Sequence, residues 1–166
     1  MTLRVISTQA ATILPLSSVK EWCRISGSAE DATMQSLIDA AIQQGEDVTW
    51  WSLRVKQLEV TYPKGQQEIK LPGGPIDTID KIEIYDGEQW GEDDDALEVI
   101  DKNNWIEVIK TYPLRVTYTT EAYSSPMINM LLQDLIIAKW ESRPEDSEQV
   151  NHILNRLSKH RNNVTL

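Results

Sequence analysis

The sequence predicts an α+β fold: a small helical bundle formed by N- and C-terminal helices, with a central antiparallel β-layer of about six short strands. Two observations support this prediction. Apolar residues recur at helical spacing up to residue 51 and again after residue 125, whereas between residues 55 and 120 they alternate with period two. A chain of 166 residues has the length of one domain, so we expect a single domain over residues 1–166.

The first predicted helix begins at the stretch SVKE, residues 18–21, which fits the capping-box pattern. In that pattern the Ser and Glu side chains accept hydrogen bonds from free backbone N–H groups at the start of the helix. The helix is expected to end near Ile25, before Gly27. Cys23 is the only cysteine, so it can form neither an intramolecular disulfide nor a Cys-based zinc site. We expect it to be a packing residue.

A second start signal at Ser28 and Asp31 leads into a longer helix, expected to run to about Trp51. Its apolar positions recur at helical spacing: Met34, Leu37, Ile38, Ala41, Ile42 and Val48. Gly45 is a weak point, because Gly costs about 1 kcal/mol relative to Ala inside a helix. Trp50 and Trp51 could stack on a ligand, but we favour a role in covering the core at the end of this helix.

The middle of the chain is predicted to form short strands joined by turns. Alternating apolar residues mark four strand faces: Leu58, Val60 and Tyr62; Ile69 and Leu71; Ile82 and Ile84; Leu114, Val116 and Tyr118. The runs LEVI (97–100) and WIEVI (105–109) are expected to pair as a hairpin across DKNN, whose Asn residues tolerate left-handed turn geometry. Further turns are expected at PKGQQ (63–67), at PGGP (72–75) and in the acidic loop DGEQWGEDDD (86–95).

Two more helices are predicted in the last third of the chain. Pro126 suits the first position of the third helix, where its missing N–H is not needed. The run PMINMLLQDLIIAKWESR is apolar around most of its circumference, which indicates burial on several sides, within the fold or against a partner. Pro144 ends this helix, and Ser147 begins the last one. The sequence KHRNNVTL then closes the chain, and we expect residues 160–166 to be a flexible tail.

The chain is acidic, with 26 Asp and Glu against 16 Lys and Arg and a formal net charge of −10. Proteins that hold nucleic acid by neutralising phosphates need clustered basic residues, so this class is disfavoured. A protein that surrounds DNA without gripping it remains compatible with the charge. The first 18 residues hold one basic residue, Arg4, and no long apolar run, so we expect neither a signal peptide nor a transmembrane span, and synthesis in the cytoplasm.

Three places in the sequence are candidates for chemistry. The acidic loop 86–95 lacks the ligand order of a calcium-binding EF-hand, so a solvated turn is favoured. Gly73 and Gly74 are flanked by prolines, which remove the backbone donors that a phosphate loop needs. His152 and His160 would need a carboxylate such as Glu148 to complete a metal site. We therefore expect no metal, cofactor or catalytic site, and a binding or assembly role rather than an enzyme.

A series of short motifs runs along the chain in a recognisable order. They are Pro15-Leu16-Ser17, Val19-Lys20, Cys23-Arg24-Ile25, Glu30-Asp31, Leu37-Ile38-Asp39-Ala40-Ala41, Leu71-Pro72-Gly73-Gly74-Pro75-Ile76, Ile82-Glu83-Ile84-Tyr85-Asp86, Val116-Thr117-Tyr118, and Pro126 through Trp140-Glu141-Ser142-Arg143. In this order and at these spacings, the motifs resemble those of the head-to-tail connector (adaptor) proteins of tailed bacteriophages. The resemblance covers nearly the whole chain and lies in the order of the motifs, since no single one is specific.

The chain departs from the pattern of that family at two places. Members often carry a Gly-rich YxxGY after the last strand, where this chain reads YTTEAYSSP. Many also carry Y-T-G-R at the end of the second helix, where this chain reads VTWWSLR. Both departures fall where the sheet joins the helices, so they concern that junction and the contacts between ring subunits.

The resemblance implies a structural virion protein without catalysis, located in the neck between capsid and tail. Such adaptors form a ring, usually a dodecamer, beneath the portal protein, extend the DNA channel and dock the next neck or tail component. DNA would pass through the channel without specific binding. Because family members often engage the portal through the C-terminal end, we expect the partner-binding residues to be Lys159, His160, Arg161, Asn162, Asn163, Val164 and Leu166.

Two alternatives remain open from the sequence. A stopper or tail-completion protein of the phage neck would share the location but is commonly a β-barrel with few helices, which the four predicted helices disfavour. A small enzyme with an unrecognised site is the alternative from a different class. His152 would be the first residue to substitute in a test of that alternative, although no local motif of the sequence supports one.

Overall fold

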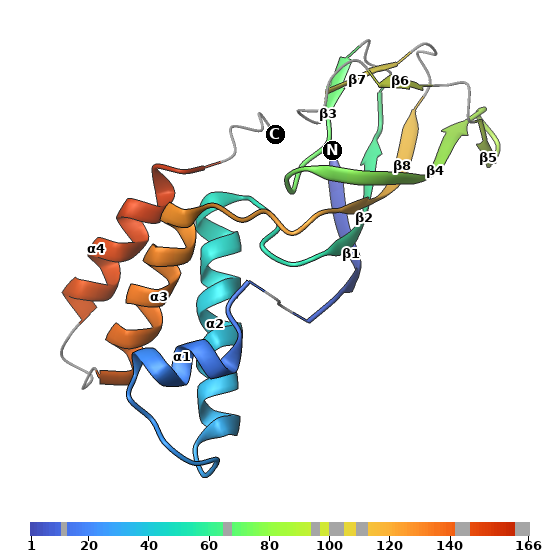
Figure 1. Ribbon diagram of the computed structural model, residues 1–166. Coiled ribbons are helices and arrows are strands. Elements are labelled where there is room, and N and C mark those ends of the chain that lie inside the picture. Colours follow the sequence, from blue (N-terminus) through green and yellow to red (C-terminus); the bar gives the residue numbers. More distant parts are fainter. Residues whose placement is uncertain are drawn as a thin grey trace. The chain divides into compact units, whose positions relative to one another are not determined.

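The computed structural model describes residues 1–10, 13–64, 68–93, 97–99, 105–108, 113–141 and 147–161 (Figure 1). The elements in chain order are β1 (Thr2–Thr8), α1 (Leu16–Trp22), α2 (Asp31–Thr49), β2 (Lys56–Tyr62), β3 (Glu68–Lys70), β4 (Ile76–Tyr85), β5 (Trp90–Glu92), β6 (Leu97–Val99), β7 (Trp105–Val108), β8 (Leu114–Thr120), α3 (Pro126–Glu141) and α4 (Ser147–Ser158). The predicted α+β class is confirmed.

The chain divides into two compact units. The helical unit combines Ala10–Leu53 with Tyr123–Asn162, and the sheet unit combines Met1–Gln9 with Arg54–Ala122. The sheet unit is thus largely an insertion between α2 and α3, with β1 added from the start of the chain. The single domain expected over residues 1–166 stays a prediction.

The helical unit is the bundle that the sequence predicted from the two ends of the chain. Helices α2, α3 and α4 pack against one another, and α1 packs on α2 (Figure 1). Their buried apolar residues form one core: Leu14, Val19, Met34, Ile38, Ala41, Ile42, Leu53, Ile128, Leu131, Leu132, Leu135, Ile136, Ala138, Ile153 and Leu157. The apolar third helix is therefore buried within its own unit, apart from Met127 and Met130, which stay exposed.

The first helix begins two residues earlier than the capping-box pattern predicted. It starts at Leu16, with Pro15 as its N-cap and no side-chain cap. The backbone N–H of Val19 donates to the Pro15 carbonyl at 3.1 Å, so Ser18 already lies inside the helix. The helix ends at Trp22, also earlier than expected. Pro supplies the extended backbone that precedes a helix, and this outweighs the Ser signal here.

Helix α2 begins at Asp31, later than the start signal at Ser28 predicted, with Glu30 as its N-cap and no side-chain cap. The carboxylate of Asp31 pairs with the ammonium group of Lys20, which also donates to the Gly27 carbonyl. One lysine of α1 therefore fixes the loop that leads into α2. At its other end α2 stops at Thr49, because Trp50 adopts a left-handed conformation with φ of 61°.

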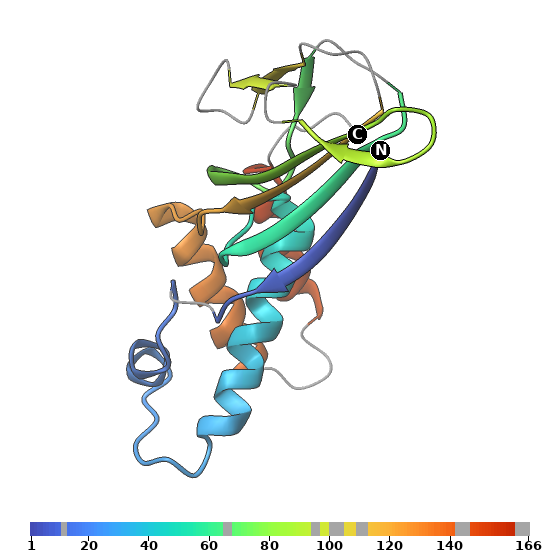
Figure 2. The same ribbon diagram turned by 90° about the vertical axis from the view of Figure 1, so that its right-hand side faces the viewer.

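The sheet unit contains a five-stranded antiparallel sheet with the strand order β1-β2-β8-β4-β5. Figure 2 shows β1, β2, β8 and β4 side by side in this order. A second, three-stranded sheet has the order β3-β7-β6, and its β6–β7 pair confirms the predicted hairpin; the DKNN turn itself lies outside the described residues. The described residues form eight strands, of which β1 and β5 were not predicted.

A second hydrophobic core lies on one face of the five-stranded sheet. It contains Leu58, Val60, Tyr62, Ile69, Leu71, Ile82, Leu114, Val116 and Tyr118. Two tyrosines of this core hold the PGGP corner: the Tyr118 hydroxyl donates to the Pro72 carbonyl at 2.8 Å, and the Tyr62 hydroxyl donates to the Lys70 carbonyl at 2.9 Å. Gly73 has a φ of 96° and Gly74 one of 118°, a conformation that favours Gly. The predicted turn is confirmed.

Candidate functional site

The C-terminal segment predicted to bind a partner is described up to Arg161. Lys159, His160 and Arg161 are exposed and follow directly on α4. Their backbone N–H groups each donate to the carbonyl three residues earlier, at 3.2, 2.9 and 3.3 Å, so the helix tightens into a final turn. Asn162, Asn163, Val164 and Leu166 lie outside the described residues. Partner binding by the segment stays a prediction.

Two tryptophans anchor the beginning of this segment, and Tyr123 stacks on one of them. We call Trp50, Trp51 and Tyr123 the aromatic cluster. The indole N–H of Trp51 donates to the His160 carbonyl at 2.9 Å, across 109 positions of sequence. The guanidinium carbon of Arg161 lies 3.3 Å from the ring centre of Trp50. Such a cation–π contact contributes roughly 0.5–1 kcal/mol at an exposed site.

The local backbone holds the aromatic cluster in place. Trp51 stacks on Tyr123, with ring centres 4.1 Å apart and planes 13° from parallel. The side-chain carboxylate of Glu46 accepts the N–H of Leu53 at 3.0 Å, and its backbone carbonyl accepts the N–H of Trp50 at 2.8 Å. Trp51 also packs against the helical core, which agrees with the predicted role of covering the core. One face of the Trp50 ring is occupied by Arg161.

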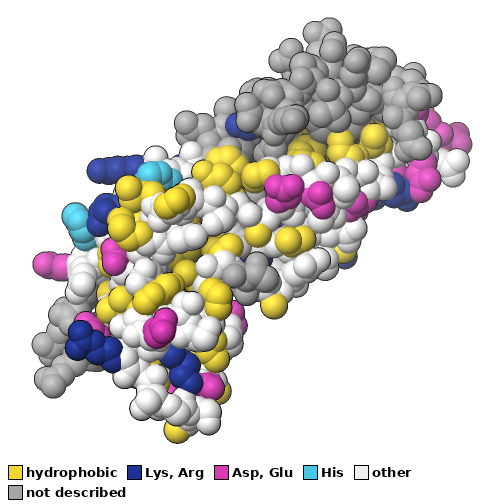
Figure 3. Space-filling view, in the orientation of Figure 1, with side chains coloured by type: hydrophobic (Ala, Val, Ile, Leu, Met, Phe, Trp, Pro, Cys, Tyr) yellow, Lys and Arg dark blue, Asp and Glu magenta, His cyan; other side chains and the backbone are white. Residues whose placement is uncertain are grey.

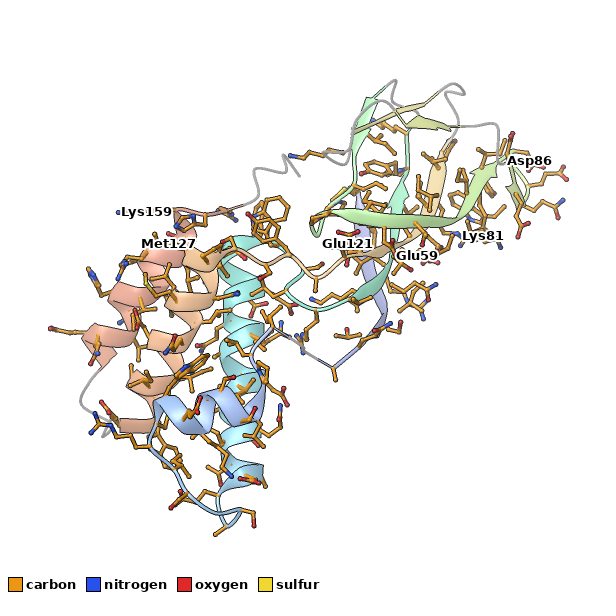
Figure 4. All side chains as sticks on the ribbon, in the orientation of Figure 1. Glu59, Lys81, Asp86, Glu121, Met127 and Lys159 are labelled. Carbon is orange, nitrogen blue, oxygen red and sulfur yellow. The ribbon has the colours of Figure 1, made fainter. Side chains whose placement is uncertain are left out.

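The first two turns of α3 carry two exposed methionines. Met127 and Met130 have 44% and 42% of their surface exposed. Figure 4 labels Met127 at the start of α3 and Lys159 just past the end of α4, at the same end of the helical unit. The helical unit thus presents an apolar pair and the start of the C-terminal segment at one end.

A polar network covers the face of the five-stranded sheet opposite its hydrophobic core. The carboxylate of Asp80 in β4 accepts hydrogen bonds from Gln57 in β2 at 2.9 Å, and from Thr119 in β8 and Thr78 in β4 at 2.8 Å. Burial acts to raise the pKa of Asp80, but these three donors together lower it. One carboxylate therefore ties three strands together.

The same face carries a chain of ion pairs. Arg115 binds the carboxylate of Glu83 through two hydrogen bonds of 2.7 Å, which holds the pKa of Glu83 below its usual value and raises the pKa of Arg115. Lys81 lies 3.1 Å from Glu83 and 2.9 Å from Glu92. These cations already have carboxylate partners that neutralise their charge, so this face is a poor binding surface for a phosphate backbone.

The acidic loop 86–95 begins with an ordered turn and continues into β5. The Asp86 carboxylate accepts the backbone N–H groups of Gln89 and Glu88, both at 2.9 Å, and these bonds lower its pKa. Asp94 and Asp95 lie outside the described residues. The favoured turn is therefore present at Asp86, with a short strand after it that was not expected.

Neither a metal-binding cluster nor a membrane-spanning helix is present in the described residues. They hold no group of three or more His, Cys, Asp or Glu side chains able to bind a metal ion; His152, His160 and Glu148 are exposed on or just after α4. None of the helices in the described ranges has the length and apolar character needed to cross a membrane. On the face in Figure 3, Lys and Arg side chains are interspersed with acidic ones.

Strand β1 is a further exposed surface, which sequence reasoning missed. Six large hydrophobic side chains in the described part of the chain are exposed, and four of them, Met1, Leu3, Val5 and Ile6, lie in or beside this strand. The alternation of Leu3, Arg4 and Val5, together with the β-branched residues around them, was the available signal.

Comparisons with known proteins identify the fold. No protein-family model and no curated protein matches the sequence. A chain from the neck of an empty gene transfer agent (GTA) particle computed with C6 symmetry matches with a TM-score of 0.72 and 18% identity, over 100% of this chain and 98% of that one. Chains from the virion of a native GTA particle and from a native GTA neck computed with C12 symmetry match over the same shares, with TM-scores of 0.71 and 0.69 at 17% and 16% identity. At these identities the likeness shows a shared fold.

Proposed function

We propose that this chain is a structural protein of the neck of a tailed bacteriophage or a related particle. One observation carries the proposal: the whole chain has the fold of nearly complete chains found in GTA particles, two of them in particle necks. The order of sequence motifs points independently to the phage neck. The two lines of argument use different information, because the motifs are local and the structural match concerns the arrangement of all elements.

Within the neck, the role proposed is that of a head-to-tail adaptor. The chain forms a ring beneath the portal, extends the DNA channel and docks the next component. The GTA necks were computed with C6 and C12 symmetry, which supports a ring of identical subunits. The net charge of −10 suits a channel that DNA must leave without adhering to its wall. The role requires no catalysis.

The C-terminal segment is proposed to bind the portal. Lys159 and Arg161 give this segment a net positive charge, whereas the chain as a whole is net negative. The contacts of His160 and Arg161 with the aromatic cluster fix where the segment leaves the helical unit. A segment with a fixed starting point loses less conformational freedom on binding than a fully free one, which favours affinity.

The first experiment measures the mass of the purified chain in solution, alone and mixed with portal rings of the same particle, with electron microscopy of each species. A ring stacked on the portal is the expected result. A chain that is monomeric alone but joins the portal is also an adaptor, assembled on a template. A chain that binds no portal in either state contradicts the proposal, and binding to a lower neck component would instead support the stopper alternative.

Truncation separates the role of the segment from that of its anchor. Deleting residues 162–166 leaves the contacts of His160 and Arg161 in place, whereas deleting 160–166 removes them. Both deletions are expected to weaken portal binding, and the longer one more strongly. Full portal binding by the chain that lacks 160–166 would exclude the proposed role of the segment.

A further inference from the structure

The two edges of the five-stranded sheet differ in how they are protected from pairing with another strand. The edge opposite β1 consists of β5, which pairs with the end of β4, and of residues 76–81 of β4, which have no outer partner among the described strands; we call these residues the β4 edge. The pairing of β4 with β8 is irregular at Asp77 and at Asp80, and the carboxylate of Asp77 is exposed at this edge. Bulges and charges of this kind hinder continuous backbone pairing with another strand, but they leave contact through side chains possible. The β1 edge has seven residues, all exposed, with Arg4 as its one charged side chain and a single irregularity at Ile6. Among the described strands, none pairs with its outer side.

Strand β1 also extends the hydrophobic face of the sheet beyond the part of this face that is buried. Leu3 pairs with Val60 and Val5 with Leu58, and directly paired residues in an antiparallel sheet point to the same face. Val60 and Leu58 are buried in the core of the sheet unit, whereas Leu3 and Val5 are 44% and 52% exposed. An apolar, unprotected edge strand associates with another chain unless something covers it.

We propose that β1 is covered by a second copy of this chain, at the opposite, β4 edge of its sheet. Charge supports this occupant. Arg4 pairs in register with Glu59 on the polar face, yet it forms no ion pair within the described residues. The β4 edge of the next copy offers the exposed carboxylate of Asp77.

The hydrophobic face supports the same occupant. Ile76 and Ile79 of β4 pack against the core of the sheet unit but stay only partly buried. Contact between the two edges would therefore join Leu3 and Val5 of one copy to a half-covered apolar strip of the next. The protecting bulges of β4 mean that this contact is made chiefly by side chains, with β1 supplying the regular strand.

The geometry of a ring favours this contact over pairing of β1 with itself. Opposite edges of one sheet form a head-to-tail contact, which repeats from copy to copy and can close into a ring, whereas β1 against β1 stops at two copies. The inference rests on the proposed function, because it assigns the subunit contact of the proposed ring.

Disulfide cross-linking tests the contact. The variant carries Arg4→Cys and Asp77→Cys in a Cys23→Ala background and is oxidised under the conditions in which the wild-type chain forms rings, with portal rings present if these are required. A ladder of covalent multimers is expected, and each single-cysteine variant should give none. A control with Arg4→Cys and Met127→Cys places the second thiol at an equally exposed site of the helical unit and should also give no ladder.

The outcomes separate this inference from the proposed function. Rings that form without cross-links overturn the contact and leave the adaptor role standing. A covalent dimer from Arg4→Cys alone shows β1 pairing with itself and also overturns the contact. A wild-type chain that forms no ring, with or without the portal, overturns both.

A second pair of variants tests the apolar part of the contact. Leu3→Glu with Val5→Glu is expected to lower the ring population at a fixed concentration by at least about tenfold, which corresponds to roughly 1.4 kcal/mol. Met127→Glu with Met130→Glu changes two side chains of similar exposure and should leave the ring population unchanged. Circular dichroism checks that both variants fold. Normal assembly of the β1 variant, or an equal loss in both, contradicts the inference.

Discussion

Two tyrosine hydroxyls hold the PGGP corner, and their burial gives the sheet unit a dependence on alkaline pH. Tyr62 and Tyr118 donate to the carbonyls of Lys70 and Pro72, which only a neutral phenol can do. Burial raises the pKa of Tyr62 to about 12 and that of Tyr118 still further. In the unfolded chain both hydroxyls titrate near an ordinary value of about 10.

We expect the free energy of unfolding to fall as the pH rises above 10. Between pH 10 and about 12 the native chain keeps the Tyr62 proton that the unfolded chain loses, so the stability gained from burial is complete below pH 10 and is lost as pH rises through that window. Each such group contributes a slope of up to about 1.4 kcal/mol per pH unit. Urea unfolding from pH 8 to 11.5 measures the slope of the free energy of unfolding against pH, and Tyr62→Phe should reduce this slope. An unchanged slope in that variant would contradict the assignment.

A larger side chain at Gly45 is predicted to destabilise the helical unit, although Gly45 lies inside a helix. A Cβ atom at Gly45 would lie 2.8 Å from Cδ2 of Leu132 and 2.9 Å from Cδ1 of Leu53, both in the core. Gly45→Leu should therefore destabilise the helical unit by about 1–3 kcal/mol through overpacking, even though Leu is the better helix former. Thermal unfolding followed at 222 nm measures this. Gln43→Leu, at an exposed position of α2, is the matched control and should have a small effect.

The role of Gly45 could not be read from the sequence. Helix propensity identifies it as a weak point, but the reason for a glycine there is the close approach of Leu132, which lies 87 positions away in the chain. For the same reason, the sequence could not reveal that Arg161 and His160 contact the aromatic cluster. Long-range contacts of this kind depend on how helices pack, which local patterns do not contain.

Single elements were predicted well where their signal was periodic. All four helices and the hairpin of β6 and β7 are present, because apolar periodicity extends over each of them. Boundaries were less accurate: Pro15 moved the start of α1, and the left-handed Trp50 ended α2 early. Strand β1 was missed because its alternation is short: Leu3 and Val5 flank Arg4, but Ile6 follows Val5 directly and breaks the pattern, and all seven residues of the strand are exposed.

The final turn after α4 should loosen when Trp51 is replaced by Phe. Phe keeps an aromatic ring to stack on Tyr123 but has no N–H to donate to the His160 carbonyl. Loss of one hydrogen bond of about 1 kcal/mol raises the equilibrium constant for opening of the turn roughly fivefold, and the rate of proteolytic cleavage rises with it. Trypsin cleavage after Lys159 and Arg161 measures this. Trp140→Phe, at a partly buried position of α3, is the control, and equal rates in the two variants would show that the hydrogen bond does not hold the turn.

The chain as a whole is expected not to bind double-stranded DNA. Acidic residues outnumber basic ones by 26 to 16, and Lys81 and Arg115 on the polar face of the sheet are paired with carboxylates. A gel-shift assay at about 0.15 M salt should show no retardation, since binding to the phosphate backbone needs clustered cations. Retardation that disappears on deleting residues 159–166 would place DNA binding in the C-terminal segment and contradict the expectation for the full chain.

The class of fold and the absence of a recognisable catalytic motif could both be argued from the sequence. The surfaces proposed to contact other proteins could not. The order of motifs pointed to a ring-forming protein, but β1 and the aromatic cluster became visible only when strands and helices were paired. A surface that serves assembly has no catalytic residues to mark it, and its apolar residues resemble those of a core until their exposure is known.

The order of the elements along the chain has a consequence for synthesis on the ribosome. Strand β8 lies between β2 and β4 in the sheet, and α3 supplies five buried Leu and Ile residues to the helical core, yet both elements come after residue 113. A nascent chain that ends before this point lacks the centre of both cores. Folding of either unit therefore waits until most of the chain has been translated, and prematurely terminated products would expose β1 and α2 together, as substrates for chaperones and proteases.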